Sequence, residues 1–375
     1  MRNFALEVFF SKWEFAARHH LTASDAQSMS LSELLALASA EDRARYDALH
    51  LGYTKTFGSP TLLAEIARTY DSLTDQQLLC FAGAEEGVYV AMRVLLKPGD
   101  HAVVITPNYQ AAETIPLSIC AVTGVPLDVA NNWALDIDAI KAALRPHTRL
   151  ISINFPNNPT GAIPPRATFD ALVDLCRSRG IWLFSDEVYR LIEQDPLARL
   201  PQVADVYERG ISLGVMSKAY GLPGLRIGWL ACQDRAFLGE CERYKHYLSI
   251  CNSAPSELLA EIALKAGDTI LTRNRGIVRH NIGLLNAFFA DFPDLFEWRP
   301  SDGGCVAFTR YKGADGVEAF TQRLVEESGV LLLPSSIYHS ELGPVPHDRF
   351  RIGFGRTGME AGLAALRDWL MRNRA

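Results

Sequence analysis

The chain has 375 residues, 48% of them hydrophobic and 21% charged, and its formal net charge is -6. This length allows two or three domains with a large core, and the composition is typical of a globular protein. The acidic balance gives no reason to expect nucleic acid or an anionic membrane as a partner, and no apolar run approaches the roughly 20 residues that a membrane span needs. Glu7, Lys12 and Glu14 interrupt the short apolar patches at the N-terminus, which argues against a secretory signal.

Cysteine and histidine usage indicates neither a disulfide framework nor a metal site. The seven cysteines are scattered and contain no CxxC pair, so we expect reduced, mostly buried thiols in a cytoplasmic protein. His19 and His20 form the only histidine pair, and no further set of ligands follows them.

The N-terminal part is predicted to be helical, with an exposed loop. The first 45 residues are aromatic at the start and helix-like from Ser30, a candidate N-cap. A loop rich in glycine follows, contains Tyr53, and leads into a helix at 61–70.

A short loop with Gly83, Ala84 and Glu85 precedes an apolar-periodic segment at 88–96. The N–H groups and the dipole at such a helix start attract a phosphate, and Gly83 lets the backbone approach it closely. Any helix start has these properties, so the signal is weak by itself.

Strand and helix patterns then alternate, which predicts an α/β fold with a mostly parallel sheet. The predicted strands are 101–106, 150–155, 181–185, 211–215 and 227–232, with a helix at 168–180. A helical segment is also predicted near 234–247. After it, a long amphipathic helix at 271–290 and strands at 306–309, 330–333 and 350–354 indicate a smaller α+β domain. We therefore predict a large domain at 46–248 and a small domain built from residues 1–45 and 249–375.

Lys218 follows directly after the predicted strand at 211–215, and Arg226 and three glycines follow it. Ligands of open α/β sheets bind outside the carboxyl ends of the strands. A desolvated lysine amine loses its proton near neutral pH, and the free amine attacks carbonyl groups. A surface lysine that closes a turn is the alternative.

Four motifs occur in the order found in one enzyme family. They are Ser217 to Gly228, Pro156-Asn157-Asn158-Pro159-Thr160-Gly161, Ser185-Asp186-Glu187-Val188-Tyr189 and Phe350-Arg351-Ile352-Gly353-Phe354. Together they resemble the fold-type-I aminotransferases of class I/II, the aspartate aminotransferase superfamily, which use pyridoxal 5'-phosphate (PLP). The resemblance runs from about Tyr53 to Arg351, most of the chain.

The resemblance implies a set of catalytic residues around the PLP ring. Lys218 would form the Schiff base with the cofactor and later carry a proton. Asp186 would pair with the pyridinium N–H, which keeps the ring an electron sink. Tyr189 and Asn158 would donate to the phenolic oxygen, and Tyr109 would stack on the ring.

It also implies contacts to the phosphate and to the substrate. Arg226 and the loop of Gly83, Ala84 and Glu85 would bind the phosphate. Many relatives have a serine three residues before the lysine, but here that residue is Val215, so one phosphate contact is in doubt although Ser217 remains. Arg351, and with it Asn158, would bind the substrate's α-carboxylate, and Tyr53 would reach the phosphate of a neighbouring subunit.

Four of these residues also have a structural alternative. Asp186 could cap a helix or form an ion pair, Tyr109 could serve packing, Tyr53 could cap its own turn, and Arg351 could be a surface strand residue. The role of Arg356 stays open.

The sequence thus predicts a homodimeric aminotransferase that moves an α-amino group from an amino acid to a 2-oxo acid in a PLP/pyridoxamine phosphate ping-pong cycle. A PLP-dependent lyase of the C–S β-lyase type, or a cyclase, is the alternative on the same scaffold, because the cofactor carries the chemistry. A PLP-binding regulatory domain is disfavoured, since no helix-turn-helix or basic segment precedes this domain. The amino donor and acceptor are not predicted.

Overall fold

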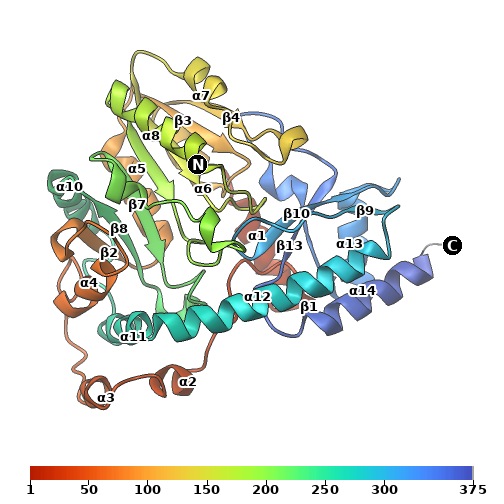
Figure 1. The fold of residues 1–375 in the computed structure, drawn as a ribbon, viewed down its shortest axis with the longest axis horizontal. Coiled ribbons are helices and arrows are strands. Elements are labelled where there is room, and N and C mark those ends of the chain that lie inside the picture. Colours follow the sequence, from red (N-terminus) through yellow and green to blue (C-terminus); the bar gives the residue numbers. More distant parts are fainter. Residues whose placement is uncertain (374–375) are drawn as a thin grey trace.

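The computed structural model describes residues 1–373 and is built around a seven-stranded sheet (Figure 1). The strands lie in the order β2-β8-β7-β6-β5-β3-β4. All neighbours are parallel except β8, which runs antiparallel to both β7 and β2. The predicted mostly parallel α/β sheet is confirmed. Its strands are β2 (Leu78–Phe81), β3 (His101–Thr106), β4 (Ala121–Pro126), β5 (Thr148–Asn154), β6 (Trp182–Asp186), β7 (Gly210–Val215) and β8 (Gly228–Cys232).

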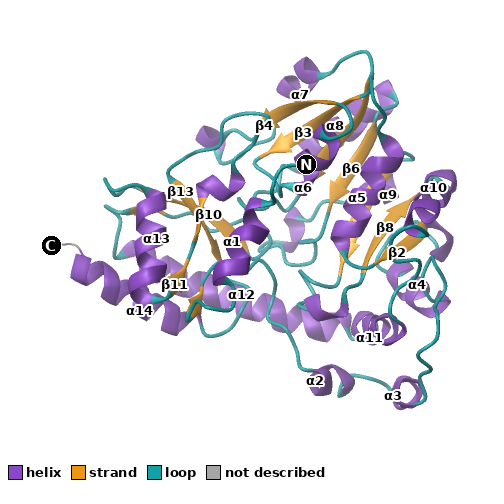
Figure 2. Ribbon diagram, turned by 180° about the vertical axis from the view of Figure 1, so that it is seen from behind, coloured by secondary structure: helices purple, strands orange, loops and turns teal. Residues whose placement is uncertain are grey.

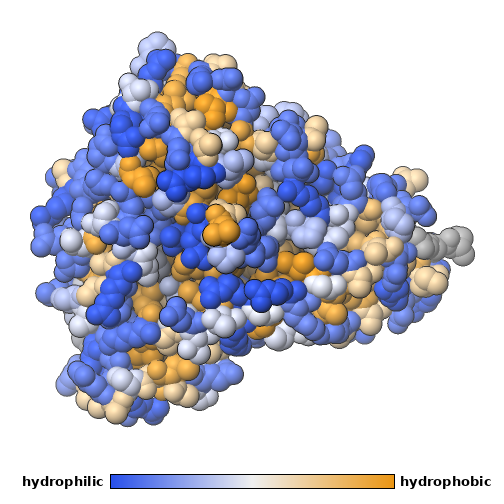
Figure 3. All heavy atoms as spheres, in the orientation of Figure 1, coloured by the Kyte–Doolittle hydropathy of each residue, from blue (hydrophilic) through white to orange (hydrophobic). Residues whose placement is uncertain are grey.

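Helices cover both faces of this sheet, as parallel strands require (Figure 2). Successive side chains of a strand point to opposite faces, so Trp182 and Phe184 of β6 join one hydrophobic cluster and Leu183 joins another. On the surface, by contrast, hydrophilic residues separate the hydrophobic ones into patches (Figure 3). The helices are α4 (Pro60–Ala67), α5 (Ala84–Leu95), α6 (Ala111–Leu117), α7 (Ile137–Ala143), α8 (Arg166–Arg179), α9 (Val203–Val206) and α10 (Arg235–Lys245).

Two strands of the large sheet were not predicted from the sequence. The strand β2 is a four-residue apolar run, too short to tell from a loop by its pattern. The strand β4 lies at the sheet edge, is mostly half-exposed, and contains Gly124 and Pro126, which are depleted in strands. The strand β2 forms by pairing with β8, far away in sequence, and β4 forms by pairing with β3 at the sheet edge.

The smaller part contains an antiparallel sheet in the order β12-β13-β10-β9 and a pair of parallel strands, β1 and β11. The pair joins the two ends of the chain, since β1 comes from the N-terminal segment. The long helix α12 runs from beneath the large sheet to this part (Figure 1). The elements are α1 (Ala5–Trp13), β1 (His19–His20), α12 (Gly267–Ala290), β9 (Phe296–Glu297), β10 (Val306–Tyr311), α13 (Val317–Ser328), β11 (Val330–Leu331), β12 (Leu333–Pro334), β13 (Arg349–Gly353) and α14 (Met359–Asn373).

Three further helices pack together below the large sheet: α2 (Leu31–Leu35), α3 (Ala40–Asp47) and α11 (Ala254–Lys265). Ser30 is the N-cap of α2, as predicted, and its side chain forms a reciprocal capping box with Glu33. Within residues 1–373, no helix combines the length and the apolar character needed to cross a membrane.

Candidate functional site

A cavity of about 400 Å³ opens at the carboxyl ends of β5, β6 and β7, under the N-terminal segment. It brings together nine of the predicted site residues, which come from five separate stretches of the chain. They are Ala84, Glu85, Tyr109, Asn158, Asp186, Tyr189, Ser217, Lys218 and Arg226. Gly83 lies directly behind this lining, whereas Arg351 and Tyr53 are not part of it.

Lys218 stands in the loop after β7 and points into the cavity. Its Nζ donates a hydrogen bond of 3.0 Å to Ser24 Oγ. Burial lowers the pKa of the Lys218 amine, and the Arg351 guanidinium lowers it further, while Asp25 opposes the shift. The amine is therefore more readily deprotonated than an ordinary lysine, as a nucleophile or base requires.

Asp186 is the last residue of β6, and Asn154 at the end of the neighbouring β5 donates to its backbone carbonyl at 3.0 Å. One carboxylate oxygen, Oδ1, accepts from the backbone N–H of Val188 at 3.2 Å. Burial raises the pKa of Asp186 to about 6, although the Val188 bond and Lys218 work against this. A carboxylate held this way favours a cationic N–H partner, because such a partner would offset its desolvation.

Tyr189 and Asn158 flank the same cavity. The Tyr189 hydroxyl donates to the backbone carbonyl of Ser24 at 2.9 Å, and burial raises the pKa of this phenol. Asn158 Oδ1 accepts from Tyr338 and Arg351, at 2.9 and 3.2 Å. That arrangement leaves the Asn158 amide N–H groups, rather than the oxygen, to serve a ligand.

The start of α5 forms a cradle with Arg226. Gly83 is the N-cap residue at φ 97°, without a side chain to cap the helix, and a Cβ there would collide with the Arg226 guanidinium. The free N–H groups of the first turn of α5 and the guanidinium fork thus meet at one place, which suits a phosphate. Val215 is buried in β7 and Ser217 lines the cavity.

Tyr109 and Glu85 form the opposite wall. The Tyr109 ring packs against Phe4 at a centroid distance of 5.0 Å, and its hydroxyl lies beside Glu85 and Glu7. Burial raises the pKa of Glu85 to about 7, and the nearby carboxylates of Asp186 and Glu7 raise it in the same direction.

Arg351 is fully buried behind the cavity lining, so it is not the surface strand residue that was its alternative. Its guanidinium donates to Tyr338 OH at 2.7 Å, to the Thr22 carbonyl at 2.7 Å and, more weakly, to Thr22 Oγ1 and Asn158 Oδ1. These contacts use four of its five N–H groups. Phe10 of α1 lies over the guanidinium, with its ring centre 6.0 Å from Cζ.

Residues 20–25 of the N-terminal segment contribute a group of lining residues that the sequence did not reveal: His20, Ala23, Ser24 and Asp25. Both carboxylate oxygens of Asp25 accept from Arg356, at 3.0 and 2.9 Å. The open question about Arg356 is thus answered in part, since it lines the cavity as half of an ion pair. Burial, with Arg356, lowers the pKa of His20 to about 4, so this histidine is neutral at physiological pH. No motif marks these residues, and only their packing places them here.

Tyr53 lies elsewhere, on an outer loop, with 93% of its surface exposed. It makes no contact with the cavity of its own chain.

These residues fit PLP by their donor chemistry. The cavity offers a lysine amine for the aldehyde, amide N–H groups, and a helix start with an arginine for the phosphate. It also offers the Asp186 carboxylate, which forms no ion pair within residues 1–373, for the ring nitrogen. Among the described residues, no group of three metal-ligating side chains could hold a metal ion.

Comparison with known proteins agrees with this chemistry. Residues 21–366 match the family of class I and II aminotransferases. The chain is 31% identical to the capreomycidine synthase of Streptomyces vinaceus over 97% of its length and 93% of that protein. It is 31% identical to the arginine–pyruvate transaminase of Pseudomonas aeruginosa, covering 81% of each. A PLP-dependent aminotransferase from Streptococcus suis has a similar structure, with a TM-score of 0.91 and 30% identity over 99% of this chain and 98% of that one.

Proposed function

This chain belongs to the class I and II aminotransferases, and on that premise we propose how its residues serve the reaction. It is a PLP-dependent enzyme that moves an amino group from an amino acid to a 2-oxo acid. The bound cofactor supplies an electron sink for the bond broken at the substrate Cα. We assign the residue roles mainly because Lys218 and Asp186 line one cavity, where the pKa of the lysine is lowered and the pKa of the aspartate is raised.

Around the ring we assign the roles that the family resemblance implied. Lys218 binds the cofactor and then holds or moves the proton of the substrate Cα at its Nζ. Asp186 accepts from the pyridine N–H, and Tyr109 packs against the ring. Asn158 donates through its free amide, whereas Tyr189 must release the Ser24 carbonyl before it can donate to the phenolic oxygen.

The phosphate and the substrate carboxylate are assigned to the two ends of the cavity. The start of α5, with Gly83, Ala84 and Glu85, binds the phosphate together with Arg226 and Ser217. Arg351 binds the α-carboxylate, with Asn158 beside it. Within residues 1–373, one Arg351 N–H makes no hydrogen bond and is available for this contact, and a carboxylate could also replace Tyr338 as the acceptor.

We extend the proposal to the amino donor, which we assign to amino acids with a basic side chain. Glu7 and Glu14 of the N-terminal helix face the cavity at helical spacing, and neither forms an ion pair within residues 1–373. Arg356, which also lines the cavity, is already paired with Asp25, so it is not available to bind a side-chain carboxylate of the substrate. The similarity to a transaminase named for arginine supports the same class.

A second function, cyclisation of a modified amino acid, stays open. The similarity to capreomycidine synthase extends over nearly the whole chain and favours it. Both reactions would use the same lysine and cofactor, so the site residues do not separate them.

A panel of amino acids in single turnover tests these assignments. We expect arginine, ornithine or lysine to convert the cofactor to pyridoxamine phosphate at least about tenfold faster than aspartate or glutamate. This ratio corresponds to an activation free energy that is lower by about 1.4 kcal/mol. Equal or faster conversion by aspartate would contradict the basic donor. Loss of the substrate's amino group without any pyridoxamine phosphate would favour lyase or cyclase chemistry.

We also propose that the protein is a homodimer in which Tyr53 reaches the partner's phosphate site. Its exposure, together with the exposed Leu51, Tyr247 and Ile250, supports an interface on this side. Mixing Lys218→Ala with Tyr53→Phe subunits should then restore one complete site per hybrid dimer. No recovery on mixing, or a monomer in sedimentation, would rule out this arrangement.

The domain division and the location complete the proposal. A large domain at 46–248 and a small one from both chain ends are supported by the β1–β11 pairing, although α11, on which α2 and α3 pack, contacts α4 of the large part. A cytoplasmic location is supported by seven cysteines, all within the described residues and none in a disulfide.

A further inference from the structure

Residues 21–27 pass as a tight strap between the Lys218 loop and the end of β13. A Cβ on Gly353 would collide with the carbonyl of Ala23, and one on Gly355 with the carbonyl of Asp25. Two glycines therefore allow this close approach, and the strap has little room to move sideways.

Hydrogen bonds fix the strap on both sides of Ser24. The Gly353 N–H donates to the Leu21 carbonyl at 2.9 Å, and the Ala26 N–H donates to the Lys218 carbonyl at 3.2 Å. The Tyr189 hydroxyl also donates to the Ser24 carbonyl, at 2.9 Å, until it turns to the cofactor. Asp25 is held by Arg356 through two bonds. The Ser24 side chain is thus oriented by its neighbours and faces the cavity.

The Lys218 amine contacts the strap through the side chain of Ser24. The distance from Nζ to Ser24 Oγ is 3.0 Å, and within residues 1–373 the amine makes no other hydrogen bond. A serine hydroxyl can accept a bond from a charged amine or donate one to a neutral amine, so it can keep contact with Lys218 in both states.

We propose that Ser24 is a positioning residue that holds the Lys218 amine in place whenever the amine is not bonded to the cofactor. The inference rests on the role proposed above for Lys218. In the step concerned, the neutral amine takes the proton of the substrate Cα. The Cα–H bond breaks, an N–H bond forms, and the electron pair stays with the substrate and the attached cofactor. The resulting ammonium donates to Ser24 Oγ, which keeps it from turning away before it returns the proton.

The kinetic test compares Ser24→Ala with the wild type, using the fastest donor of the amino acid panel with hydrogen or deuterium at Cα. We expect the single-turnover rate to fall about 10- to 100-fold, because a misplaced base costs rate in this range. The KM should change less than about twofold, because Ser24 holds the base rather than the substrate. The primary isotope effect should be at least as large as in the wild type, since proton transfer becomes slower.

A second measurement uses the apoenzyme and needs no turnover. The pH dependence of Lys218 acetylation by acetic anhydride, followed by peptide mass spectrometry, reports the protonation of this amine. As an acceptor Ser24 favours the charged amine, so Ser24→Ala should move the labelling midpoint to lower pH. Lys245 provides an internal reference, because it is buried in another part of the chain and bonded to the carbonyls of Thr56 and Cys80.

Two variants separate positioning from folding. Ser24→Thr keeps the hydroxyl and should restore the rate to within about threefold of the wild type. Ser30→Ala removes a hydroxyl from the same N-terminal segment, at the cap of α2 outside the cavity, and should leave the rate and the labelling of Lys218 unchanged. If Ser24→Ala does not fold, Ser24→Cys replaces it, because a thiol is a weak acceptor of similar size.

The outcomes decide the inference in either direction. Wild-type rate and labelling in Ser24→Ala would overturn it, and so would a slow Ser24→Ala that Ser24→Thr does not rescue and whose labelling is unchanged. Turnover in Lys218→Ala would instead overturn the role of the lysine itself. An inactive Lys218→Ala beside an unaffected Ser24→Ala would remove this inference alone.

Discussion

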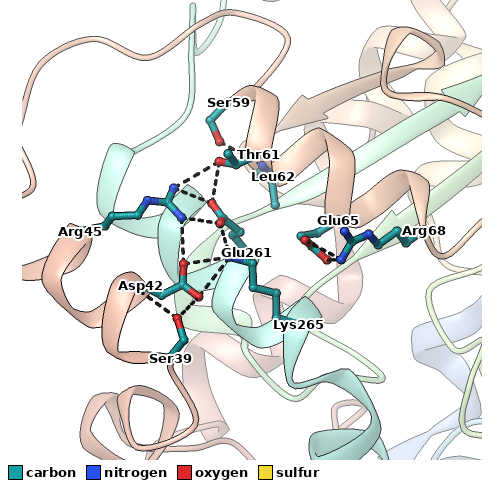
Figure 4. A network of polar contacts seen from close by, with 10 residues as sticks. All are labelled: Ser39, Asp42, Arg45, Ser59, Thr61, Leu62, Glu65, Arg68, Glu261 and Lys265. Atoms are coloured by element: carbon teal, nitrogen blue, oxygen red, sulfur yellow. Dashed lines mark hydrogen bonds and ion pairs between the residues drawn. The ribbon is translucent and has the colours of Figure 1, made fainter.

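Two groups of charged side chains around buried carboxylates are built in opposite ways. One joins α3, α4 and α11 below the large sheet, where Asp42 and Glu261 face Arg45 and Lys265 (Figure 4). The other lines the cavity at the carboxyl ends of β5 to β7. The first group matches each carboxylate with cations. The second contains the Asp25–Arg356 pair, but within residues 1–373 its Lys218 and Asp186 form no ion pair.

In the network of α3 and α11, hydrogen bonds and ion pairs lower the carboxylate pKa values more than burial raises them. Burial alone would raise the pKa of Glu261, but Arg45, Lys265 and Thr61 donate to its carboxylate at 2.6 to 2.9 Å, and its pKa is lowered. Burial opposes the shift at Asp42 too, and bonds from Lys265 and Ser39 lower its pKa. The network therefore stabilises the ionised carboxylates.

In the cavity, burial outweighs the partners. The pKa of Asp186 rises to about 6 and that of Lys218 falls, each because its charged form is desolvated. The opposite pKa shifts in the two groups indicate that the cavity, and not the network, is where a charged ligand would bind. The charges of the network are paired with one another, whereas Lys218 and Asp186 would gain partners when a cofactor and a substrate bind.

The largest expected effect comes from removing the lysine. Lys218→Ala should lower turnover about 10³-fold or more, because both the covalent link and the base are lost. The absorption band of lysine-bound PLP should also disappear from the purified protein. Retained turnover near the wild type would remove Lys218 from the chemistry, and an unchanged unfolding transition would serve as the control for folding.

Removing the charge of the aspartate should have a smaller effect. Asp186→Asn should still bind PLP, but its rate should fall at least about tenfold, because the amide no longer stabilises a protonated ring nitrogen. A tenfold fall corresponds to an activation free energy that is higher by about 1.4 kcal/mol. Stopped-flow single turnover measures the rate. A change below tenfold would leave Asp186 with a structural role only.

In the network the same kind of substitution should change stability instead of rate. Glu261→Gln should lower the free energy of unfolding at pH 7 by about 2 kcal/mol, less than for a fully buried pair because Arg45 and Lys265 are partly exposed. Since the folded pKa of Glu261 is lowered, its contribution is present above the unfolded pKa and is lost as the pH falls through the folded value.

Urea unfolding at fixed protein concentration, at pH 7 and near pH 4, checks both points. The difference between the wild type and Glu261→Gln should shrink at the lower pH, and a difference independent of pH would contradict the electrostatic origin. Glu65→Gln is the matched control. Among the described residues Glu65 pairs only with the largely exposed Arg68, so this substitution should cost less than about 1 kcal/mol.

The sequence by itself determined five of the seven strands of the large sheet and the site residues that follow them. Buried runs such as 101–106 and 211–215 became strands at those positions, and the side chains that follow strand ends, Asp186 and Lys218, meet in one cavity. The reason lies in the geometry of a parallel sheet. In a parallel sheet the carboxyl ends of the strands lie at the same edge, so residues just after different strands come together however far apart they are in the chain.

Tertiary structure alone decided what closes this cavity. Ser24 lies 194 residues from Lys218 and Asp25 lies 331 from Arg356, and no period or motif links them. Likewise, Arg351 could be assigned to β13 from its pattern, but its burial beneath Phe10 and its bonds to Tyr338 and Thr22 arise from three separate segments. Such contacts depend on how whole elements pack, and a local pattern of residues carries no information about them.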